Sequence, residues 1–185
     1  MTKKHLIQIV VFFLIAVSAT AVDLSTKAWV FNRLGMPGTS DVDWQWEGVF
    51  GFETALNEGA LFGMGQGFVL GFAGLSCLVL LGIVIWLVFW HRPKSWYLVI
   101  VMGMITGGII GNLYDRLGLH GLHYWVSDGT HFVEKPVYAV RDWILIMIGS
   151  YHWPNFNFAD SFLVAGVILL AIYVLFLDPN NKKTV

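Results

Sequence analysis

The sequence predicts an all-α integral membrane protein: a four transmembrane helix bundle with extracytoplasmic loops, leaving room for a small β or interfacial element outside the membrane. Hydrophobic residues make up 57% of the chain and charged residues only 12%, against about 25% charged in an average soluble domain. Four apolar runs have the length, about 20 residues, that a helix needs to cross the hydrocarbon core. The formal net charge of −1 gives no basic field, so no nucleic-acid partner is expected.

The predicted spans cover residues 6–22, 68–90, 97–113 and 158–177, and together they make residues 1–185 a single membrane-embedded domain. The apolar stretch 143–148 is too short to span, so we expect it to lie at the interface or against the bundle. Cys77, inside the second run, is interpreted as a small buried hydrophobe.

The first run also imitates a secretory signal, because Lys3 and Lys4 precede it and an Ala-x-Ala cleavage pattern, residues 19–21, ends it. However, polar residues from Asp23 to Lys27 continue the same helix without a loop, and three more spans follow. These features favour a first helix that is retained.

Lysine and arginine near the short connections predict the orientation. They precede the first run, fill the link between the second and third, and follow the fourth: Lys3, Lys4, Arg92, Lys94, Lys182 and Lys183. Both termini are therefore expected in the cytoplasm. The long connections 32–67 and 114–157 then lie outside, together with every acidic residue except Asp178. The polar chemistry is predicted near the outer face.

Polar clusters stand where the predicted spans meet that face, at residues 56–63, 107–116, 141–144 and 155–161. A carboxylate at membrane depth costs roughly 2.5 to 3.5 kcal/mol on insertion scales, which makes each one a functional-site hypothesis. Two acids that share a proton can hydrolyse a peptide bond without a metal, since one activates water and the other protonates the carbonyl oxygen. Asp160 would feel the positive end of its helix, which leaves Asp142 as the expected proton holder.

Structural interpretations of the same residues stay open. Asp160 could serve only as an acid at a helix start, and Asp115 with Arg116 could be an ion pair at a span end. The third span also carries small residues at the spacing that lets helices approach closely, which favours packing over catalysis. They are Gly103, Gly107, Gly108 and Gly111.

Five blocks in order along nearly the whole chain resemble the lipoprotein signal peptidase family, the type II signal peptidases. The blocks are residues 23–27 (DLSTK), 57–63 (NEGALFG), 108–116 (GIIGNLYDR), 141–144 (RDWI) and 156–161 (FNFADS). The resemblance implies an aspartic peptidase that cleaves diacylglyceryl-modified prolipoproteins before the lipidated cysteine, at the outer leaflet of the bacterial inner membrane. Its partners would be those precursors and membrane lipids, with no cofactor and no metal.

The same resemblance assigns roles to particular residues. The catalytic pair would be Asp142 and Asp160. The residues that support the pair or bind substrate would be Asp23, Lys27, Asn57, Gly108, Asn112, Asp115, Arg116, Asn157 and Ala159.

The chain departs from the family pattern in two places. Glu58 stands where the family commonly has threonine, and residues 117–140 form an apparent insertion between two blocks. The insertion offers a second candidate for the first catalytic acid, Asp128. We favour Asp142, because an apolar segment follows it at once, whereas Asp128 begins a polar, turn-like stretch.

Three rival functions remain. A metal-dependent membrane peptidase could use the insertion's ligand types, His120, His123, Asp128, His131 and Glu134, although no H-E-x-x-H pattern is present. A presenilin-like protease is suggested by Tyr114 and Asp115, but its G-x-G-D motif is missing. A small channel or carrier would need ionisable residues in the middle of several spans, and the second and fourth runs have none there.

Overall fold

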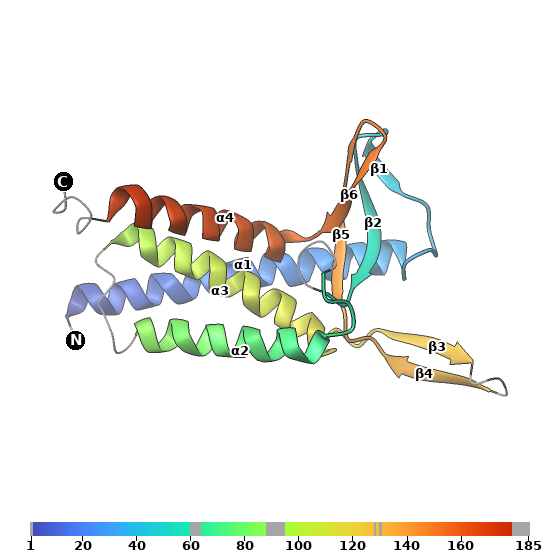
Figure 1. Ribbon diagram of the computed structural model, residues 1–185, viewed down its shortest axis with the longest axis horizontal. Coiled ribbons are helices and arrows are strands. Elements are labelled where there is room, and N and C mark those ends of the chain that lie inside the picture. The colour runs from blue at the N-terminus through green and yellow to red at the C-terminus, as the bar shows by residue number, and fades with distance from the viewer. Residues whose placement is uncertain (1, 60–63, 88–94, 128, 130, 179–185) are drawn as a thin grey trace. The chain divides into compact units, whose positions relative to one another are not determined.

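A computed structural model gives the fold of residues 2–59, 64–87, 95–127, 129 and 131–178 (Figure 1). This part contains the helices α1 (Lys3–Leu34), α2 (Val69–Ile85), α3 (Trp96–Arg116) and α4 (Phe158–Ile172), the last continued by a π-helical turn (Tyr173–Leu177). Helices α1, α3 and α4 with its extension are long and apolar enough to cross a membrane, and α2 is a shorter apolar helix of 17 residues. The last residues of the predicted second span, and Arg92 and Lys94 after it, lie outside the described residues.

The chain divides into two compact units. The helical unit contains Met1–Asp23, Cys77–Gly111 and Phe158–Val185, and the sheet unit contains Leu24–Ser76 and Asn112–Asn157. The predicted helices are present, three of them long and apolar enough to span, but the fold is not all-α, because the β element allowed outside the membrane is a sizeable antiparallel sheet region. The two long connections form β-strands instead of loops, because their apolar residues are buried by pairing between segments far apart in the sequence.

Close helix packing holds the helical unit together. A Cβ atom on Gly107 of α3 would lie 2.5 Å from the Cβ of Ala19 on α1, and one on Gly108 would lie 2.6 Å from the carbonyl oxygen of Ala159 on α4. Neither neighbour is the flexible end of a side chain, so only glycine fits. The predicted packing role of these glycines is confirmed. A buried cluster that includes Phe12, Val99 and Ile105 fills the rest of the interior.

The prediction of a buried Cys77 is wrong, because this residue is exposed on α2. Its apolar neighbours Leu75 and Leu78 are 56% and 67% exposed. An apolar helix surface of this kind is what a span presents to lipid, where burial within the protein is not required.

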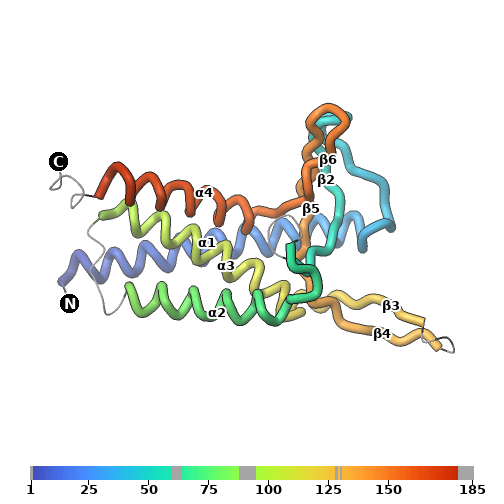
Figure 2. The backbone as a smooth tube through the Cα atoms, in the orientation of Figure 1, coloured from blue at the N-terminus to red at the C-terminus, as the bar shows by residue number. Residues whose placement is uncertain are grey.

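The sheet unit is built on a four-stranded antiparallel sheet of order β1-β2-β5-β6. Its strands are β1 (Asp43–Trp46), β2 (Phe50–Asn57), β5 (Val140–Ile148) and β6 (Tyr151–Phe156), and Figure 2 shows the chain path that brings β2 beside β5. A separate hairpin pairs β3 (His123–Ser127) with β4 (Phe132–Pro136).

The apolar stretch 143–148, predicted to lie at the interface, belongs to the inner strand β5. Its residues Val140 to Leu145 are all buried. A short continuous apolar run is equally typical of a strand that is buried on both faces. Trp143 packs edge-on against Phe52 of β2, with ring centroids 5.2 Å apart.

Two β-bulges flank the centre of this sheet. In β2, Glu53 and Thr54 both stand opposite Trp143, and in β6, Pro154 and Asn155 both stand opposite Leu145. A bulge bends its strand and redirects side chains, and it tolerates proline because the ladder is already interrupted. The four bulge residues all line one pocket.

Candidate functional site

Asp142 is the centre of a buried polar network in the sheet unit. It lies on β5 opposite Ala55 and is 2% exposed. The side-chain amide of Asn57, the last residue of β2, donates to Oδ2 of Asp142 at 3.2 Å, and the amide of Asn157 donates to Oδ1 at 2.6 Å. Both carboxylate oxygens are thus held by donors from two segments, which fixes the orientation of the group.

A second set of contacts holds Asn157 in turn. Oδ1 of Asn112, near the end of α3, accepts from Asn157 at 3.2 Å and from the ammonium group of Lys27 at 2.9 Å. Lys27 also lies 3.2 Å from Oδ2 of Asp115, and both of these side chains are completely buried. A buried ammonium group requires such partners, because leaving it unpaired would lower the stability of the fold by roughly several kcal/mol.

Asp115 receives further donors from Arg141, the residue before Asp142. The backbone N–H of Arg141 donates to Oδ2 at 3.0 Å, and its guanidinium donates to Oδ1 from Nε at 3.1 Å and from Nη2 at 2.8 Å. Arg141 was not among the predicted site residues. Its position beside a candidate catalytic acid was the one available signal. The ion pair fixes the start of β5 to the end of α3.

Arg116 holds the segment that follows β2. Its Nη2 donates to the carbonyl oxygen of Gly59 at 2.9 Å, and its guanidinium lies 5.5 Å from the centroid of the Phe72 ring. The N–H of Gly59 donates to Oδ1 of Asn57 at 2.9 Å, so the amide nitrogen of Asn57 is directed to Asp142. Arg116 therefore acts on Asp142 through the loop.

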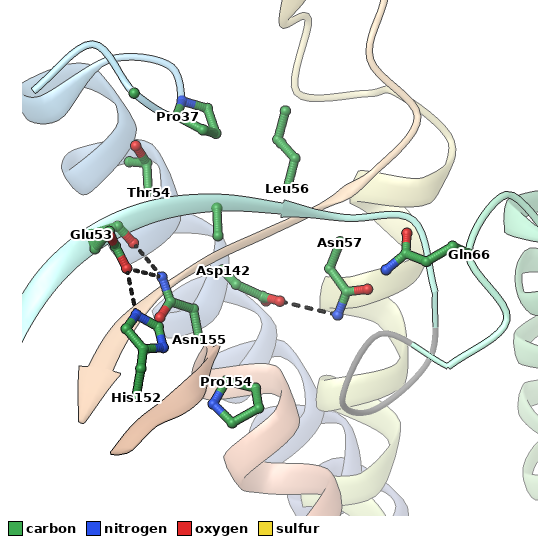
Figure 3. A pocket seen from close by; sticks show the side chains of 12 residues that line it. Pro37, Glu53, Thr54, Leu56, Asn57, Gln66, Asp142, His152, Pro154 and Asn155 are labelled. Atoms are coloured by element: carbon green, nitrogen blue, oxygen red, sulfur yellow. Dashed lines mark hydrogen bonds and ion pairs between the residues drawn. The ribbon is translucent and has the colours of Figure 1, made fainter. Parts of the chain in front are cut away.

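A pocket of about 500 Å³ opens beside Asp142 and Asn57 (Figure 3). Its size falls within the range typical of ligand sites, about 300 to 1,000 Å³. The bulge residue Glu53 is held there by the amide of Asn155 at 2.9 Å and by the ring of His152 at 3.0 Å. Sequence reasoning missed Glu53 and His152, which belong to no polar block at the end of a span, and it assigned no role to Asn155 of the block 155–161.

Other predicted site residues meet in the helical unit. The backbone N–H of Ala159, at the start of α4, donates to Oδ1 of Asp23 at 2.9 Å, and both residues are fully buried. A carboxylate that accepts from a helix N-terminus satisfies a donor that has no partner inside the helix. A Cβ on Gly111 would collide with the carboxylate of Asp23. Asp160 follows Ala159 and lies in the first turn of α4.

The insertion that suggested a metal site folds as the β3-β4 hairpin with its connection to α3. Nδ1 of His120 accepts from the N–H of Leu122 at 2.9 Å, and His123 lies 3.8 Å from Glu134 across the hairpin. Burial, as the largest effect, lowers the pKa of His120 below its usual value of 6.5. No group of three or more potential ligands is found in the described part of the chain. Asp128 lies outside the described residues.

Comparison with known proteins gives a consistent result over most of the chain. Residues 15–176 match the family model for signal peptidase (SPase) II, Peptidase_A8. A lipoprotein signal peptidase of Rhodopirellula baltica is 46% identical over 87% of this chain and 70% of its own length. One from Xylella fastidiosa is 33% identical over 100% of this chain and 99% of its own length. One from Bacillus pumilus is 34% identical, with 94% and 96% covered.

A solved bacterial membrane enzyme has the same fold. It superimposes with a TM-score of 0.70 at 26% identity, over 94% of this chain and 92% of its own length. The sheet and the helices described above are therefore features that this chain has in common with a known membrane enzyme.

Proposed function

We propose that this chain, which belongs to the signal peptidase II family, uses Asp142 and Asp160 as its catalytic pair. As a member of that family it is an aspartic-type signal peptidase, a multi-pass membrane enzyme that removes signal peptides from prolipoproteins. The proposal concerns which residues perform the reaction and where they lie in the membrane.

The environment of Asp142 carries the proposal. It is a buried carboxylate, held by amide donors on both oxygens, and it lines a pocket large enough for a peptide segment. Asn157, which donates to Asp142, precedes Asp160 by three residues. Three residues extend at most about 11 Å, so the chain itself limits how far the second acid can be from the first.

The reaction then follows from two carboxyl groups and one water molecule. The ionised group takes a proton from water, whose oxygen attacks the scissile carbonyl carbon, while the protonated group gives its proton to the carbonyl oxygen. The tetrahedral intermediate collapses when the C–N bond breaks and the leaving amine takes a proton from the pair. The two acids exchange the roles of base and acid during each turnover.

The remaining predicted residues position this pair. Asn57 and Asn157 orient Asp142, and Asp23 fixes the N-terminus of the helix that carries Asp160. The others act through these contacts: Lys27, Asn112, Asp115 and Arg116 by hydrogen bonds and ion pairs, and Gly108 and Ala159 by the close approach of α3 to α4.

The finer assignments complete the proposal. The chain is one domain with four spans in the bacterial inner membrane, with both termini in the cytoplasm and the catalytic pair near the outer face. The distribution of lysine and arginine supports this orientation. The precursors are diacylglyceryl-modified and are cleaved before the lipidated cysteine, and the reaction uses no cofactor. Substrate and enzyme then meet within one lipid leaflet.

Processing of a diacylated precursor by purified protein in detergent tests the assignment. Asp142→Asn and Asp160→Asn should each accumulate uncleaved precursor, with turnover lowered by about two to four orders of magnitude. Asp128→Asn is the matched control, because it removes the competing acid of the insertion, and it should cleave at a nearly normal rate. A parallel reaction contains EDTA, to which the proposed pair is insensitive.

The opposite pattern would refute the assignment. If Asp128→Asn abolished cleavage while Asp142→Asn preserved it, at equal amounts of folded protein, the first acid would lie in the insertion. Loss of activity in EDTA with recovery on addition of zinc would assign the chemistry to a metal site. Outer-face labelling of a Lys94→Cys variant would reverse the proposed orientation.

A further inference from the structure

The β3-β4 hairpin exposes large apolar side chains that the rest of the described chain leaves uncovered. Trp125 is 66% exposed and Phe132 is 73% exposed. All five residues of β4 and four of the five in β3 are exposed, and the two strands pack chiefly against each other. A two-stranded hairpin without a packing partner is marginally stable in water. Its exposed apolar side chains therefore need a partner that shields them from water.

The pairing register places the two aromatic rings on one face. Trp125 stands opposite Glu134, and Phe132 stands opposite Ser127. Alternate residues of a strand share a face, so Trp125 and Ser127 project to the same side as Phe132 and Glu134. Tyr124 and Lys135, which stand opposite each other, project to the other side together with the pair Val126 and Val133. The face that carries Trp125, Ser127 and Phe132 is called the aromatic face below.

The base of the hairpin is fixed to the end of a spanning helix. The N–H of Leu119 donates to the carbonyl oxygen of Tyr114 at 3.2 Å, and the hydroxyl of Tyr114 donates back to the carbonyl oxygen of Leu119 at 2.8 Å. The N–H of Val137, after β4, donates to the carbonyl oxygen of Leu122 at 3.0 Å. These contacts lie within the sheet unit, which includes the end of α3. The hairpin is thus held close to the point where α3 ends.

We infer that the aromatic face of the hairpin binds the surface of the lipid bilayer at the end of α3. Tryptophan and phenylalanine favour the boundary between head groups and acyl chains, where an apolar ring is accepted beside polar groups. Leu117 and Leu119, which lie between α3 and the hairpin, are 46% and 57% exposed and add further apolar surface next to the end of the span. Glu134 lies 3.8 Å from His123, and both can keep their polar atoms among the head groups.

Continuity with the membrane span distinguishes lipid from a second copy of the chain as the cover. Leu117 and Leu119, which directly follow the membrane-length helix α3, are exposed, as are Trp125 and Phe132 of the hairpin. Only six residues, 117–122, separate α3 from β3, a distance of at most about 22 Å when extended. The inference does not depend on the assignment of the catalytic pair.

Fluorescence of a labelled full-length chain in nanodiscs tests the contact. Cys77 is the only cysteine, so Cys77→Ser supplies a background for single labels. Ser127→Cys places an environment-sensitive NBD label on the aromatic face with both rings intact, and Lys135→Cys places it on the opposite face. The nanodiscs contain phosphatidylethanolamine and phosphatidylglycerol, with or without lipids that carry a nitroxide quencher near the glycerol backbone.

The label at residue 127 should emit at a shorter wavelength than the label at residue 135. Nitroxide lipid should quench the label at residue 127 at least about three times as strongly as the label at residue 135. Adding Trp125→Ser and Phe132→Ser to the Ser127→Cys chain should remove that difference. Cleavage of precursor by each labelled chain verifies its fold.

Equal quenching at the two positions would overturn the inference. So would a label at residue 127 that emits at short wavelength but is not quenched by nitroxide lipid, because protein would then cover the aromatic face. A label that is quenched only by aqueous iodide would show that the face lies in water.

Discussion

The buried charges around Asp115 predict an unequal response to removing either partner of one ion pair. Lys27 and Arg141 both contact Asp115, at 3.2 Å and 2.8 Å, so the carboxylate is held between two cations. At an effective dielectric constant of about 20, these contacts are worth roughly 5 and 6 kcal/mol before desolvation is subtracted. Asp115→Asn leaves two buried cations without their carboxylate. Lys27→Met leaves a neutral pair of Asp115 and Arg141.

The expected losses in the free energy of unfolding differ accordingly. Asp115→Asn should cost about 5 kcal/mol, the upper end for breaking a buried ion pair. Lys27→Met should cost about 2 kcal/mol, since Arg141 still pairs with Asp115 and Asn112 keeps its donor from Asn157. The double variant should be more stable than Asp115→Asn alone, because the substitution of Lys27 removes one of the unpaired cations.

Titration with SDS in mixed micelles, followed by tryptophan fluorescence, measures these unfolding free energies. The two single variants and the double variant form a double-mutant cycle. The double variant should lose less stability than the sum of the two single losses, by a coupling energy of roughly several kcal/mol. Additive losses, or a larger loss for Lys27→Met than for Asp115→Asn, would refute this account of the charge cluster. If folded Asp115→Asn were as inactive as Asp160→Asn, Asp115 would have to join the catalytic pair.

Three further predictions concern packing, orientation and pH. Gly107→Leu should destabilise the protein by about 2 kcal/mol or more, because the side chain meets Ala19; thermal unfolding of Gly74→Leu, where no atom lies within 4 Å, is the control. Asn157→Leu should lower kcat about 100-fold with a smaller change in KM, since Asp142, the proposed catalytic carboxylate, loses a positioning donor. Equal kcat and KM in the variant and the unsubstituted chain would contradict this. Burial lowers the pKa of His120, so the unfolded chain binds its proton more readily and stability should fall as the pH drops below 6.5. Unfolding curves of His120→Gln should lose this part of the pH dependence.

The helices were predictable because the signal for a span is local. A continuous apolar run of membrane length identifies a helix without knowledge of its neighbours. Asn57, Asn112, Asp115 and Asp142, which meet in one buried polar network, were also singled out, since carboxylates and amides at span ends are costly and therefore conspicuous. The spacing of the glycines in α3 was enough to predict their role in helix packing.

The sheet was not predictable in the same way, because its strands pair across long separations. Asp142 stands opposite Ala55, and neither segment shows a clear alternation of polar and apolar residues. The partner of Asp115 was equally hidden. Arg116 is adjacent to Asp115 in the sequence, but the guanidinium that donates hydrogen bonds to the Asp115 carboxylate belongs to Arg141. Partner choice of this kind depends on three-dimensional proximity, which a single sequence does not express.

The sequence of the insertion does contain a local pattern that is typical of a β-hairpin. Asp128 and Gly129 form a dipeptide typical of two-residue turns, and aromatic and β-branched residues stand on both sides of it. The stretch was interpreted as a polar turn alone. The aromatic and β-branched residues at 124–126 and 132–133, on either side of this turn, predict two paired strands.

The network around Asp142 also constrains when this polar site can be completed during synthesis of the chain. Asn57 and Asp142 are 85 residues apart in the chain, as are Lys27 and Asn112, and Asn157 comes later than all of them. Contacts between such distant segments form late, because loop closure must precede them. A chain that has not yet been made as far as residue 157 lacks the donor to Oδ1 of Asp142. The environment of Asp142 is therefore complete only after residue 157 has been made, and a chain truncated before that residue would not have this donor.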